Sequence, residues 1–312
     1  MAYPLAAGYR NIGAAGMGYN PTIYSGKLTK KLYKSTVFGE IANTNHEGEI
    51  KAFGESVIIR ALPDINIRRY SKGQALNVEQ PTSTKTTLNI DKGYYWSFGD
   101  EAVEHAQTDL KNYVEAWTDV ASRQLQIAID LDVLSNVYAD VHASNTGSTA
   151  GAVSGNIDIG TDGGTAIQIT KDNVIDYIVY CGQVLTEQNV DMDGRWMVVP
   201  EWFYTCLLLS DLKAAFLTGD SVSPIRNGKA GVVCNFTIYR SNQVPTSADG
   251  AVAQASHVMF GTRQAITFAT QLVKNETAPN PFGFGNIYKG LQVYGYSVEL
   301  PEALGDLYCK KG

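Results

Sequence analysis

Apolar residues recur at steps of three and four between Asp100 and about Val141, and this spacing predicts one helix of about 40 residues. The positions that form this stripe are Val103, Ala106, Leu110, Val114, Trp117, Ala121, Leu125 and Ala128. With a rise of 1.5 Å per residue, such a helix would extend ~60 Å, beyond the diameter of a typical small domain. A helix of this length needs a packing partner along its side, so we interpret it as a structural strut.

Strand-like runs precede the helix. They are rich in β-branched and aromatic residues, and they are interrupted by Pro63 and by a polar stretch that contains Gly73 and Pro81. The runs are Ser56–Leu62, Ile65–Tyr70, Thr86–Ile90 and Tyr94–Phe98. We interpret residues 50–98 as a long two-stranded hairpin with its tip near residues 71–85. An isolated hairpin is only marginally stable in water, so we expect a neighbouring subunit to hold it in place.

The rest of the chain mixes helices and strands, which makes the fold class α+β. A loop rich in Gly, Ser, Thr and Asn at residues 144–164 is a candidate domain boundary. Residues 1–26 combine several glycines with tyrosines and lack periodicity, which is typical of an extended arm. Helices are predicted at residues 27–41, 170–189, 202–209 and 211–217, and strands at 195–199, 232–239, 255–260, 264–274 and 290–299.

Charge and composition narrow the function. The net charge of −6 argues against generic nucleic-acid binding, which normally requires a basic face. The four cysteines are scattered, which favours free thiols, although the even number leaves disulfides open. We find no signal-peptide pattern at the start and no apolar run long enough to span a membrane, so no membrane partner is expected.

Catalytic and metal-binding patterns are scarce. The sequence contains neither a GxSxG motif nor a phosphate-binding loop. Glu101 and His105 stand four residues apart and could share a metal, but a solvated pair on a polar helix face is the simpler interpretation. Asn189–Gly194 imitates the start of a calcium loop, yet the required glutamate is missing, which favours a helix-to-strand turn. We therefore expect no enzyme activity, no cofactor and no metal, with paired carboxylates on the long helix as the remaining alternative.

The order of these elements resembles the major capsid proteins of tailed bacteriophages, which have the Hong Kong 97-like fold. That order is an extended arm, a projecting hairpin, a long helix, an α/β domain and a returning strand. The stretches that carry the resemblance are Lys34–Asn43, Gly48–Lys51, Val57–Arg60, Leu88–Lys92, Leu185–Pro200, Gly228–Gly231 and Ile238–Asn242 with Pro245.

The resemblance implies a division of the chain into five parts: an N-terminal arm (1–45), an extended loop (46–98), a peripheral domain with the spine helix (99–164), an axial domain (165–280) and a return to the peripheral domain (281–312). It also implies self-assembly as pentamers and hexamers into an icosahedral shell of the virion, built in the host bacterial cytoplasm. The implied partners are further copies of the chain, a portal, a scaffolding protein that is separate or already removed, a possible decoration protein, and packaged double-stranded DNA bound without sequence specificity.

The hairpin tip supports a sharper hypothesis about the contact between subunits. Arg68, Arg69 and Lys72 cluster near the tip, whereas the long helix is acidic. We expect the tip to cross a neighbouring subunit and to pair with acids there, for which the candidates are Glu101, Glu104 and Asp109. The alternative is a solvated charged tip. Exposed ion pairs contribute only ~0.2–1 kcal/mol each, so such pairs would set register rather than strength.

Two other functions compete with the capsid interpretation. An encapsulin-type bacterial nanocompartment shell shares the fold and would enclose cargo enzymes instead of DNA. A soluble enzyme with an unrecognised site would instead be a monomer or a small oligomer with a defined pocket.

Overall fold

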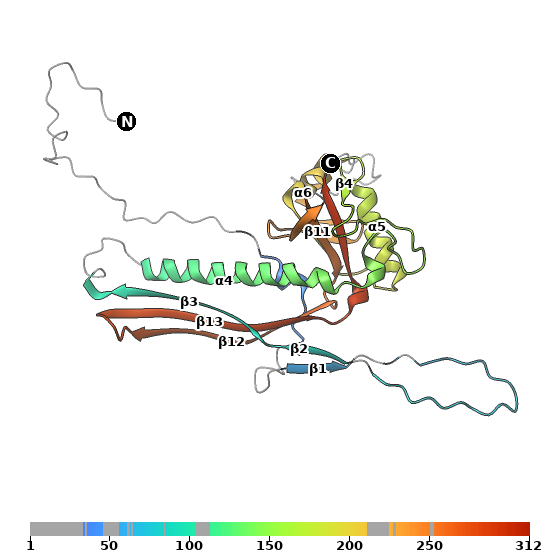
Figure 1. Ribbon diagram of the computed structural model, residues 1–312, viewed down its shortest axis with the longest axis horizontal. Coiled ribbons are helices and arrows are strands. Elements are labelled where there is room, and N and C mark those ends of the chain that lie inside the picture. Colours follow the sequence, from blue (N-terminus) through green and yellow to red (C-terminus); the bar gives the residue numbers. More distant parts are fainter. Residues whose placement is uncertain are drawn as a thin grey trace, which may run out of the picture.

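The computed structural model describes most of the chain from residue 34 onward. The described residues are 34, 36–45, 56–60, 63, 65–83, 85–103, 113–210, 225–226, 229–249 and 253–312. Within them the molecule is elongated, with a compact part, a long arm that projects from it, and a thin loop that projects in the opposite direction (Figure 1).

The compact part is built on one mixed sheet. Buried residues of the sheet and of two helices, among them Phe203, Phe236 and Phe260, form a single apolar core. Neighbouring strands in the sheet are β4 (Ile167–Ile169), β14 (Leu304–Lys311), β11 (Ala253–Thr262), β5 (Arg195–Val199), β9 (Phe236–Arg240) and β8 (Val232–Val233), with β10 (Thr246–Asp249) beside β11. The helices are α5 (Val174–Glu187) and α6 (Glu201–Leu209).

Several predictions for this part are confirmed. Strand β5 is buried at all five positions and ends before Pro200, and α5 lies within the predicted helix. The segment between α5 and β5 is a helix-to-strand turn in which Asn189 has a φ of 60°. The guanidinium of Arg195 stabilises this turn by donating to the carbonyl oxygens of Asp191, Gly182 and Val190 at 2.8, 3.0 and 2.6 Å.

The long arm consists of one helix on an antiparallel sheet. Strands β3 (Lys92–Glu101) and β12 (Ile266–Pro279) flank β13 (Gly285–Val298), and α4 (Tyr113–Val137) runs along one face of the sheet (Figure 1). Phe98 of β3 meets Trp117 of α4 edge-on, with ring centroids 5.6 Å apart. The predicted helix start at Asp100 is therefore wrong, because Asp100 and Glu101 close strand β3. The described helix has 25 residues, which corresponds to about 37 Å.

The hairpin is shorter than predicted. Strands β1 (Ser56–Arg60) and β2 (Lys85–Asn89) pair antiparallel, with Arg60 opposite Lys85. Tyr94–Phe98 is a strand, as expected, but it pairs with β13 of the long sheet instead of the other side of the hairpin. The base of the hairpin packs on the long sheet through a small apolar cluster of Ile59, Leu88, Ile90 and Ala269, against which Val57 and Val293 also pack.

The last strand was not predicted. Residues 290–299 belong to β13 in the long arm, and the chain then crosses back through η5 (Pro301–Ala303) to β14 in the compact sheet. All positions of β14 up to Cys309 are buried, but Gly305 and Asp306 break the apolar run, so the sequence shows neither alternation nor a continuous apolar stretch. The C-terminal residues therefore do not end in the arm.

Shorter elements complete the described chain: α1 (Phe38–Ile41), η1 (Tyr138–Asp140), η2 (Ala143–Asn145), β6 (Ile225–Arg226) and β7 (Lys229–Ala230). Of the helix predicted at residues 27–41, only the end is seen in α1, and residues 27–33 lie outside the described residues, as does the helix predicted at 211–217. In the described part of the chain, no helix is long and apolar enough to cross a membrane.

Candidate assembly surfaces

The projecting loop, residues 65–83, is held together by a few polar contacts between its two sides. Glu79 accepts hydrogen bonds from the backbone N–H of Asn66 at 2.7 Å and from its side-chain amide at 3.1 Å. The guanidinium of Arg68 adds a contact of 3.3 Å to the same carboxylate. The hydrogen bonds from Asn66 are the main cause that lowers the pKa of Glu79. At the tip, the N–H of Gln74 donates to the carbonyl oxygen of Ser71 and closes a turn.

Apolar side chains of this loop face solvent. Ile67 is 94% exposed and Val78 is 85% exposed, values that are unusual for large aliphatic residues clustered on one segment. The other exposed apolar residues of the loop are Ile65, Tyr70 and Leu76. Exposed aliphatic side chains do not stabilise a loop that packs against nothing. These side chains therefore indicate a surface that another molecule covers.

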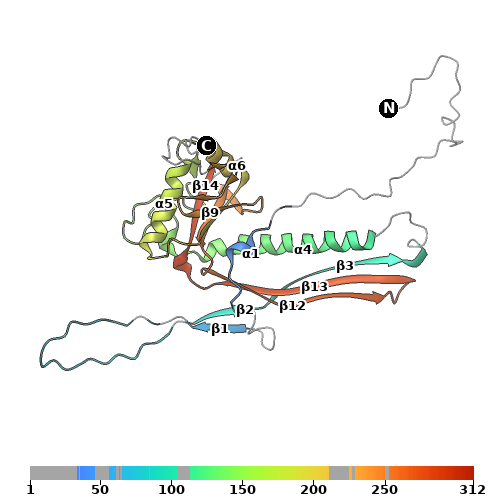
Figure 2. The ribbon, with the colours of Figure 1, turned by 180° about the vertical axis from the view of Figure 1, so that it is seen from behind.

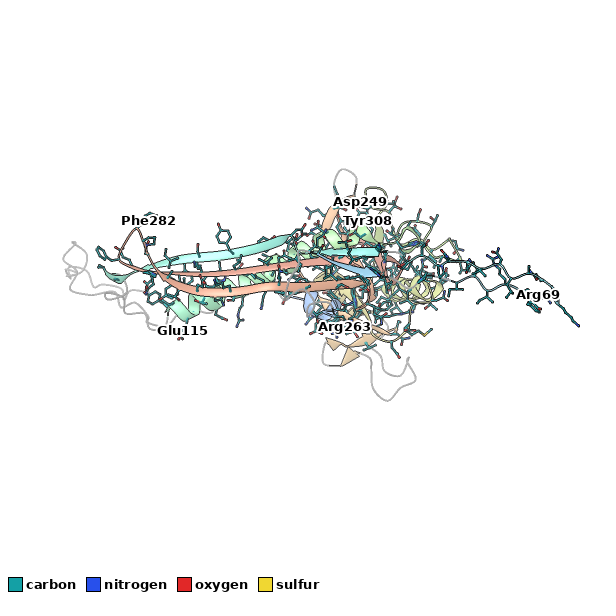
Figure 3. All side chains as sticks on the ribbon, turned by 90° about the horizontal axis from the view of Figure 1, so that it is seen from below. Arg69, Glu115, Asp249, Arg263, Phe282 and Tyr308 are labelled. Carbon is teal, nitrogen blue, oxygen red and sulfur yellow. The ribbon has the colours of Figure 1, made fainter. Side chains whose placement is uncertain are left out.

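The structure separates the residues of the predicted tip contact. Arg69 lies at one extremity of the molecule, whereas Phe282, beside the end of the long sheet, lies at the other (Figure 3). Glu101 is exposed and pairs in register with Gly285 at that far end. Arg68 has an internal partner in Glu79, Lys72 is exposed, and Glu104 and Asp109 lie outside the described residues. A contact between the basic tip and Glu101 thus requires a second copy of the chain.

The face of the long sheet that points away from α4 carries a groove of about 530 Å³. Its residues are Tyr95, Trp96, Ser97, Lys274, Glu276, Lys289, Gly290 and Leu291. Tyr95 is 78% exposed, and Glu276 forms ion pairs with Lys274 and Lys289, of which Lys274 contributes most to lowering its pKa. Because side chains alternate along a strand, Glu101 lies on the same face of β3 as Tyr95.

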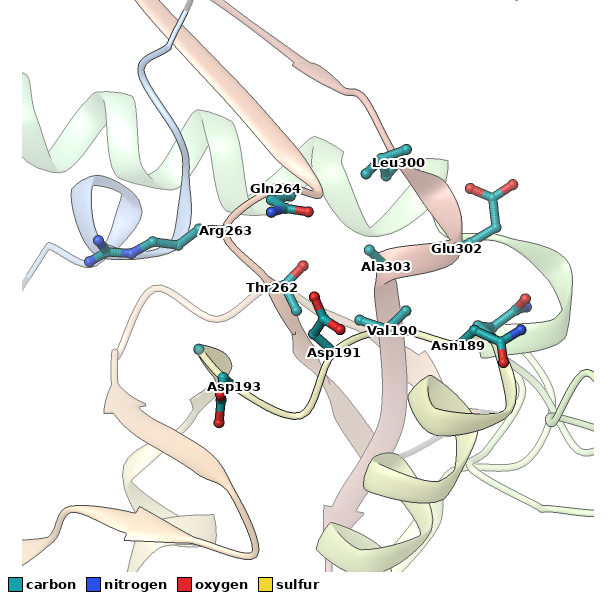
Figure 4. A pocket seen from close by; sticks show the side chains of 12 residues that line it. Asn189, Val190, Asp191, Asp193, Thr262, Arg263, Gln264, Leu300, Glu302 and Ala303 are labelled. Atoms are coloured by element: carbon teal, nitrogen blue, oxygen red, sulfur yellow. The ribbon is translucent and has the colours of Figure 1, made fainter. Parts of the chain in front are cut away.

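The joint between the compact part and the long arm holds a second hollow, of about 420 Å³ (Figure 4). Asp191 and Asp193 line it from the α5–β5 turn, Glu302 from η5, and Arg263 from the turn between β11 and β12. The guanidinium of Arg263 is paired with Glu40 of α1 at 2.8 Å. Among the described residues, no group of acidic, histidine and cysteine side chains is arranged to hold a metal ion.

Sequence reasoning missed a buried polar cluster around His257. Its Nδ1 lies 2.7 Å from Asp306, its Nε2 lies 3.0 Å from the hydroxyl of Ser247, and Tyr138 stacks on its ring at 4.1 Å. Distances of this kind also occur in serine hydrolases. Here, however, the Ser247 hydroxyl donates to Asp162 at 2.7 Å, and His257 is fully buried. The cluster is therefore a polar core that ties β10, β11 and β14 to the segment after α4.

Two of the four cysteines lie in the core. Cys181 and Cys309 are buried, and burial raises the pKa of both thiols, with the Asp306 carboxylate as a further cause. Cys206 is half-buried, and Cys234 is exposed. All four are free thiols.

Comparison with known proteins agrees with the architecture. The family described as phage capsid protein matches residues 83–305, which is more than half of the chain. No curated protein sequence gives a significant match.

Several solved chains share the fold over nearly their whole length. A chain of Mycobacterium phage Che8 is 20% identical, with a TM-score of 0.75, and the match covers 93% of this chain and 97% of that one. A chain from the capsid of cyanophage P-SCSP1u is 15% identical, with a TM-score of 0.72 and 94% of each chain covered. A chain from the mature capsid of bacteriophage PhiM1 is 14% identical, with a TM-score of 0.68 and 99% of each chain covered.

These likenesses confirm the expected Hong Kong 97-like fold, and the family match confirms a structural role in the virion instead of an enzymatic one. The chain belongs to the phage capsid protein family.

Proposed function

We propose that this chain is the major capsid protein of a tailed phage. Its copies assemble as pentamers and hexamers into an icosahedral shell that encloses double-stranded DNA. The observation that carries the proposal is a pair of surfaces on limbs that project in opposite directions: the loop with its exposed aliphatic residues, and the exposed face of the long sheet. Surfaces that differ and lie far apart favour heterologous contacts, which close into rings when the rotation between copies allows it.

We assign the domains of the family by sheet and not by continuous ranges of sequence. In this proposal, β3, β12, β13 and α4 form the peripheral domain, the compact sheet with α5 and α6 forms the axial domain, and β1, β2 and the loop between them form the extended loop. The net charge of −6 suits the wall of a DNA container, because a wall that bound phosphates tightly would retard packaging. A portal, a scaffolding protein and a decoration protein are further proposed partners.

We further propose that the basic tip of the loop docks on the long sheet of a neighbouring copy. Arg68, Arg69 and Lys72 would lie near Glu101, with Glu104 and Asp109 as additional acids. The apolar groove next to Tyr95 and Leu291 lies on the same face as Glu101 and offers a surface for the exposed aliphatic residues of the loop. The ion pairs would fix the register, and burial of apolar area would supply most of the affinity.

Electron microscopy of purified particles tests the function. Closed icosahedral shells that contain DNA and one portal vertex are the expected result. Shells that enclose protein cargo and lack a portal would support a nanocompartment instead. A chain that remains a monomer or small oligomer at high concentration, as judged by sedimentation velocity, would contradict the proposal.

Charge reversal tests the contact at the tip. The variant Arg68→Glu/Arg69→Glu should lose most closed shells at ordinary salt, and Glu101→Arg introduced into that variant should restore part of the yield. The matched control is Lys171→Glu, which changes an exposed lysine of the compact part and should assemble like the wild type. Normal shell yields from the double variant would eliminate the tip contact while leaving the capsid function intact.

A further inference from the structure

A buried carboxylate lies where the compact part meets the long arm. Asp130, in the second half of α4, is fully buried. Its Oδ1 accepts from the backbone N–H groups of Val37 at 3.0 Å and Phe38 at 2.9 Å, and its Oδ2 accepts from the side-chain amide of Gln243 at 2.6 Å. Burial raises the pKa of Asp130, and the three N–H donors oppose that effect. Burying a carboxylate is costly, so its three directed contacts point to a specific task.

Residues 36–43, here called the joint clip, connect this carboxylate to both parts of the molecule. Val37, Ile41 and Ala42 are buried in the apolar cluster that also contains residues of α4, β5, β11 and β12. Asn43 pairs with the start of β12: its N–H donates to Ile266, and its carbonyl oxygen accepts from Phe268, both at 2.9 Å. The clip passes beside the joint (Figure 2).

An ion pair fixes the middle of the clip to the turn between the two sheets. The Nε of Arg263 donates to the carbonyl oxygen of Glu40 at 2.7 Å, and its Nη2 lies 2.8 Å from the Glu40 carboxylate. Arg263 also lines the hollow of about 420 Å³ at the joint. The joint is thus packed where the clip lies and open at the adjacent hollow, so the clip contacts restrict how the arm can swing relative to the compact part.

We propose that Asp130 is a positioning residue: it locks the joint clip across the two parts and so fixes the angle at which the long arm leaves the compact sheet. In an assembled shell that angle determines the curvature between neighbouring copies, a consequence that rests on the proposed function. The residue acts through the clip and touches no substrate. Gln243 is its support from the compact part, because this side chain follows β9 and reaches the helix of the arm.

Substitutions at Asp130 and a control can distinguish the effect of its hydrogen bonds on the clip from an effect on overall stability. Asp130→Ala removes all three acceptor contacts and should release the clip. Asp130→Asn retains an oxygen for the amides of Val37 and Phe38. Its new N–H₂ group can donate to the side-chain oxygen of Gln243 once the Gln243 amide turns over, and that oxygen is buried without a partner in the described structure. Asp130→Asn should therefore keep the clip closed. Val133→Ala is the control, because it removes buried volume from the same helix and cluster without touching the clip hydrogen bonds.

The first measurement uses the unassembled full chain. Hydrogen exchange at the amides of Val37, Phe38 and Asn43 should accelerate at least tenfold in Asp130→Ala and remain near wild type in Asp130→Asn and Val133→Ala. Small-angle X-ray scattering should show a broader distribution of overall dimensions for Asp130→Ala alone. If Asp130→Ala fails to fold, Gln243→Leu, which removes only the contact from the compact part, should broaden the scattering distribution while Val37 and Phe38 stay protected.

The second measurement is the diameter of assembled particles. Asp130→Ala should give particles of altered or heterogeneous diameter, whereas Val133→Ala should lower thermal stability but leave the diameter unchanged. Wild-type protection of the clip amides in Asp130→Ala would overturn the lock, and so would unchanged scattering together with an unchanged diameter. Failure of every variant and of the wild type to assemble would count against the proposed capsid function, while the exchange and scattering results would still decide the role of Asp130.

Discussion

Gly295 marks the place where the base of the hairpin crosses the long sheet. A Cβ atom at this position would lie 2.0 Å from the carbonyl oxygen of Asn89 and 3.0 Å from the Cα of Ile90. Only a residue without a side chain allows the two backbones to approach this closely. The apolar contacts of Leu88 and Ile90 with the sheet depend on that approach.

Gly295→Ala is therefore expected to lower the free energy of unfolding by ~1–3 kcal/mol, because rigid backbone surrounds the new methyl group. Urea unfolding measures the loss, and hydrogen exchange at Thr87 and Leu88 should accelerate. Gly99→Ala is the matched control, since this strand glycine is exposed and a Cβ there meets no atom within 4 Å. It should stay within ~0.5 kcal/mol of wild type. Equal effects of the two substitutions would contradict the close-approach argument.

The charged tip shows what sequence could and could not predict about single residues. The basic cluster of Arg68, Arg69 and Lys72 is visible in the sequence and does lie in an exposed loop. The partner of Arg68 within the loop, Glu79, was not predicted, because which side chains face each other depends on the register between the two sides of the loop. The solvent exposure of the aliphatic residues was not predicted either, because aliphatic residues in a strand-like pattern are equally consistent with a buried core.

At the scale of elements, predictions succeeded where the apolar pattern was unambiguous. They failed where a strand pattern ran directly into a helical pattern. Helix α5 follows the apolar spacing of a helix, and β5 is a short, unbroken apolar run that Pro200 ends. The junction at Asp100 was misassigned, because the strand alternation of Tyr94, Trp96 and Phe98 continues directly into helical spacing. The pairing of β3 with β13 joins residues far apart in the chain, and local patterns hold no information on such contacts.

The side of α4 that faces the sheet carries a polar network that holds helix and sheet together. The ammonium of Lys92 lies 3.1 Å from Asp132, and the hydroxyl of Tyr294 donates to the same carboxylate at 2.9 Å. The hydroxyl of Tyr296 donates to the carbonyl oxygen of Asp132 at 3.1 Å. Burial is the main cause that raises the pKa of Tyr294 and of Tyr296. For Lys92, burial lowers the pKa, but the hydrogen bonds to Tyr296 and Asp132 outweigh it and the net shift is upward.

These shifts predict a loss of stability in alkali. The folded-state pKa values of both tyrosines exceed their unfolded values of about 10, so above that pH the unfolded chain releases protons first and unfolding becomes easier. Lys92 acts in the same direction, because its contribution is complete below an unfolded pKa of about 10.4 and is lost at higher pH. The urea midpoint of the protein should thus fall between pH 9 and 11, as urea unfolding at a series of pH values, followed by circular dichroism, can show.

Removing one tyrosine hydroxyl should flatten that pH dependence. Tyr294→Phe loses a hydrogen bond to a carboxylate, worth ~1.5–3 kcal/mol at neutral pH, but leaves one fewer group to ionise on unfolding, so its midpoint should decline less steeply in alkali. Tyr95→Phe alters an exposed tyrosine of the same sheet and should decline as the wild type does. A wild-type slope in Tyr294→Phe would mean that the alkaline loss arises elsewhere.

At the scale of the whole molecule, the sequence predicted the essential property: the chain has projecting segments that do not bury their apolar side chains within the same molecule. Ile67 and Val78 on the loop and Phe282 and Phe284 at the end of the arm are all more than 80% exposed. The loop, marked by Arg69, and the end of the arm, marked by Phe282, lie at opposite ends of the molecule (Figure 3). Isolated soluble proteins rarely expose large apolar groups in this manner. What the sequence could not supply is the direction of each limb, which follows from packing at the joint.

Assembly should therefore change the dynamics of the limbs and leave the compact sheet unchanged. We expect the amides of residues 65–83, many of which lack strand partners within the chain, to exchange rapidly in the unassembled protein and to gain at least tenfold protection in closed particles. Strands β5 and β11, which are already paired and buried, should exchange at the same rate in both states. Hydrogen exchange with mass spectrometry on unassembled and assembled protein compares the two. Because the aliphatic side chains of the loop gain a covered environment only from another copy, particles in which residues 65–83 stay as exchangeable as in the free chain would show that the loop is not an assembly contact.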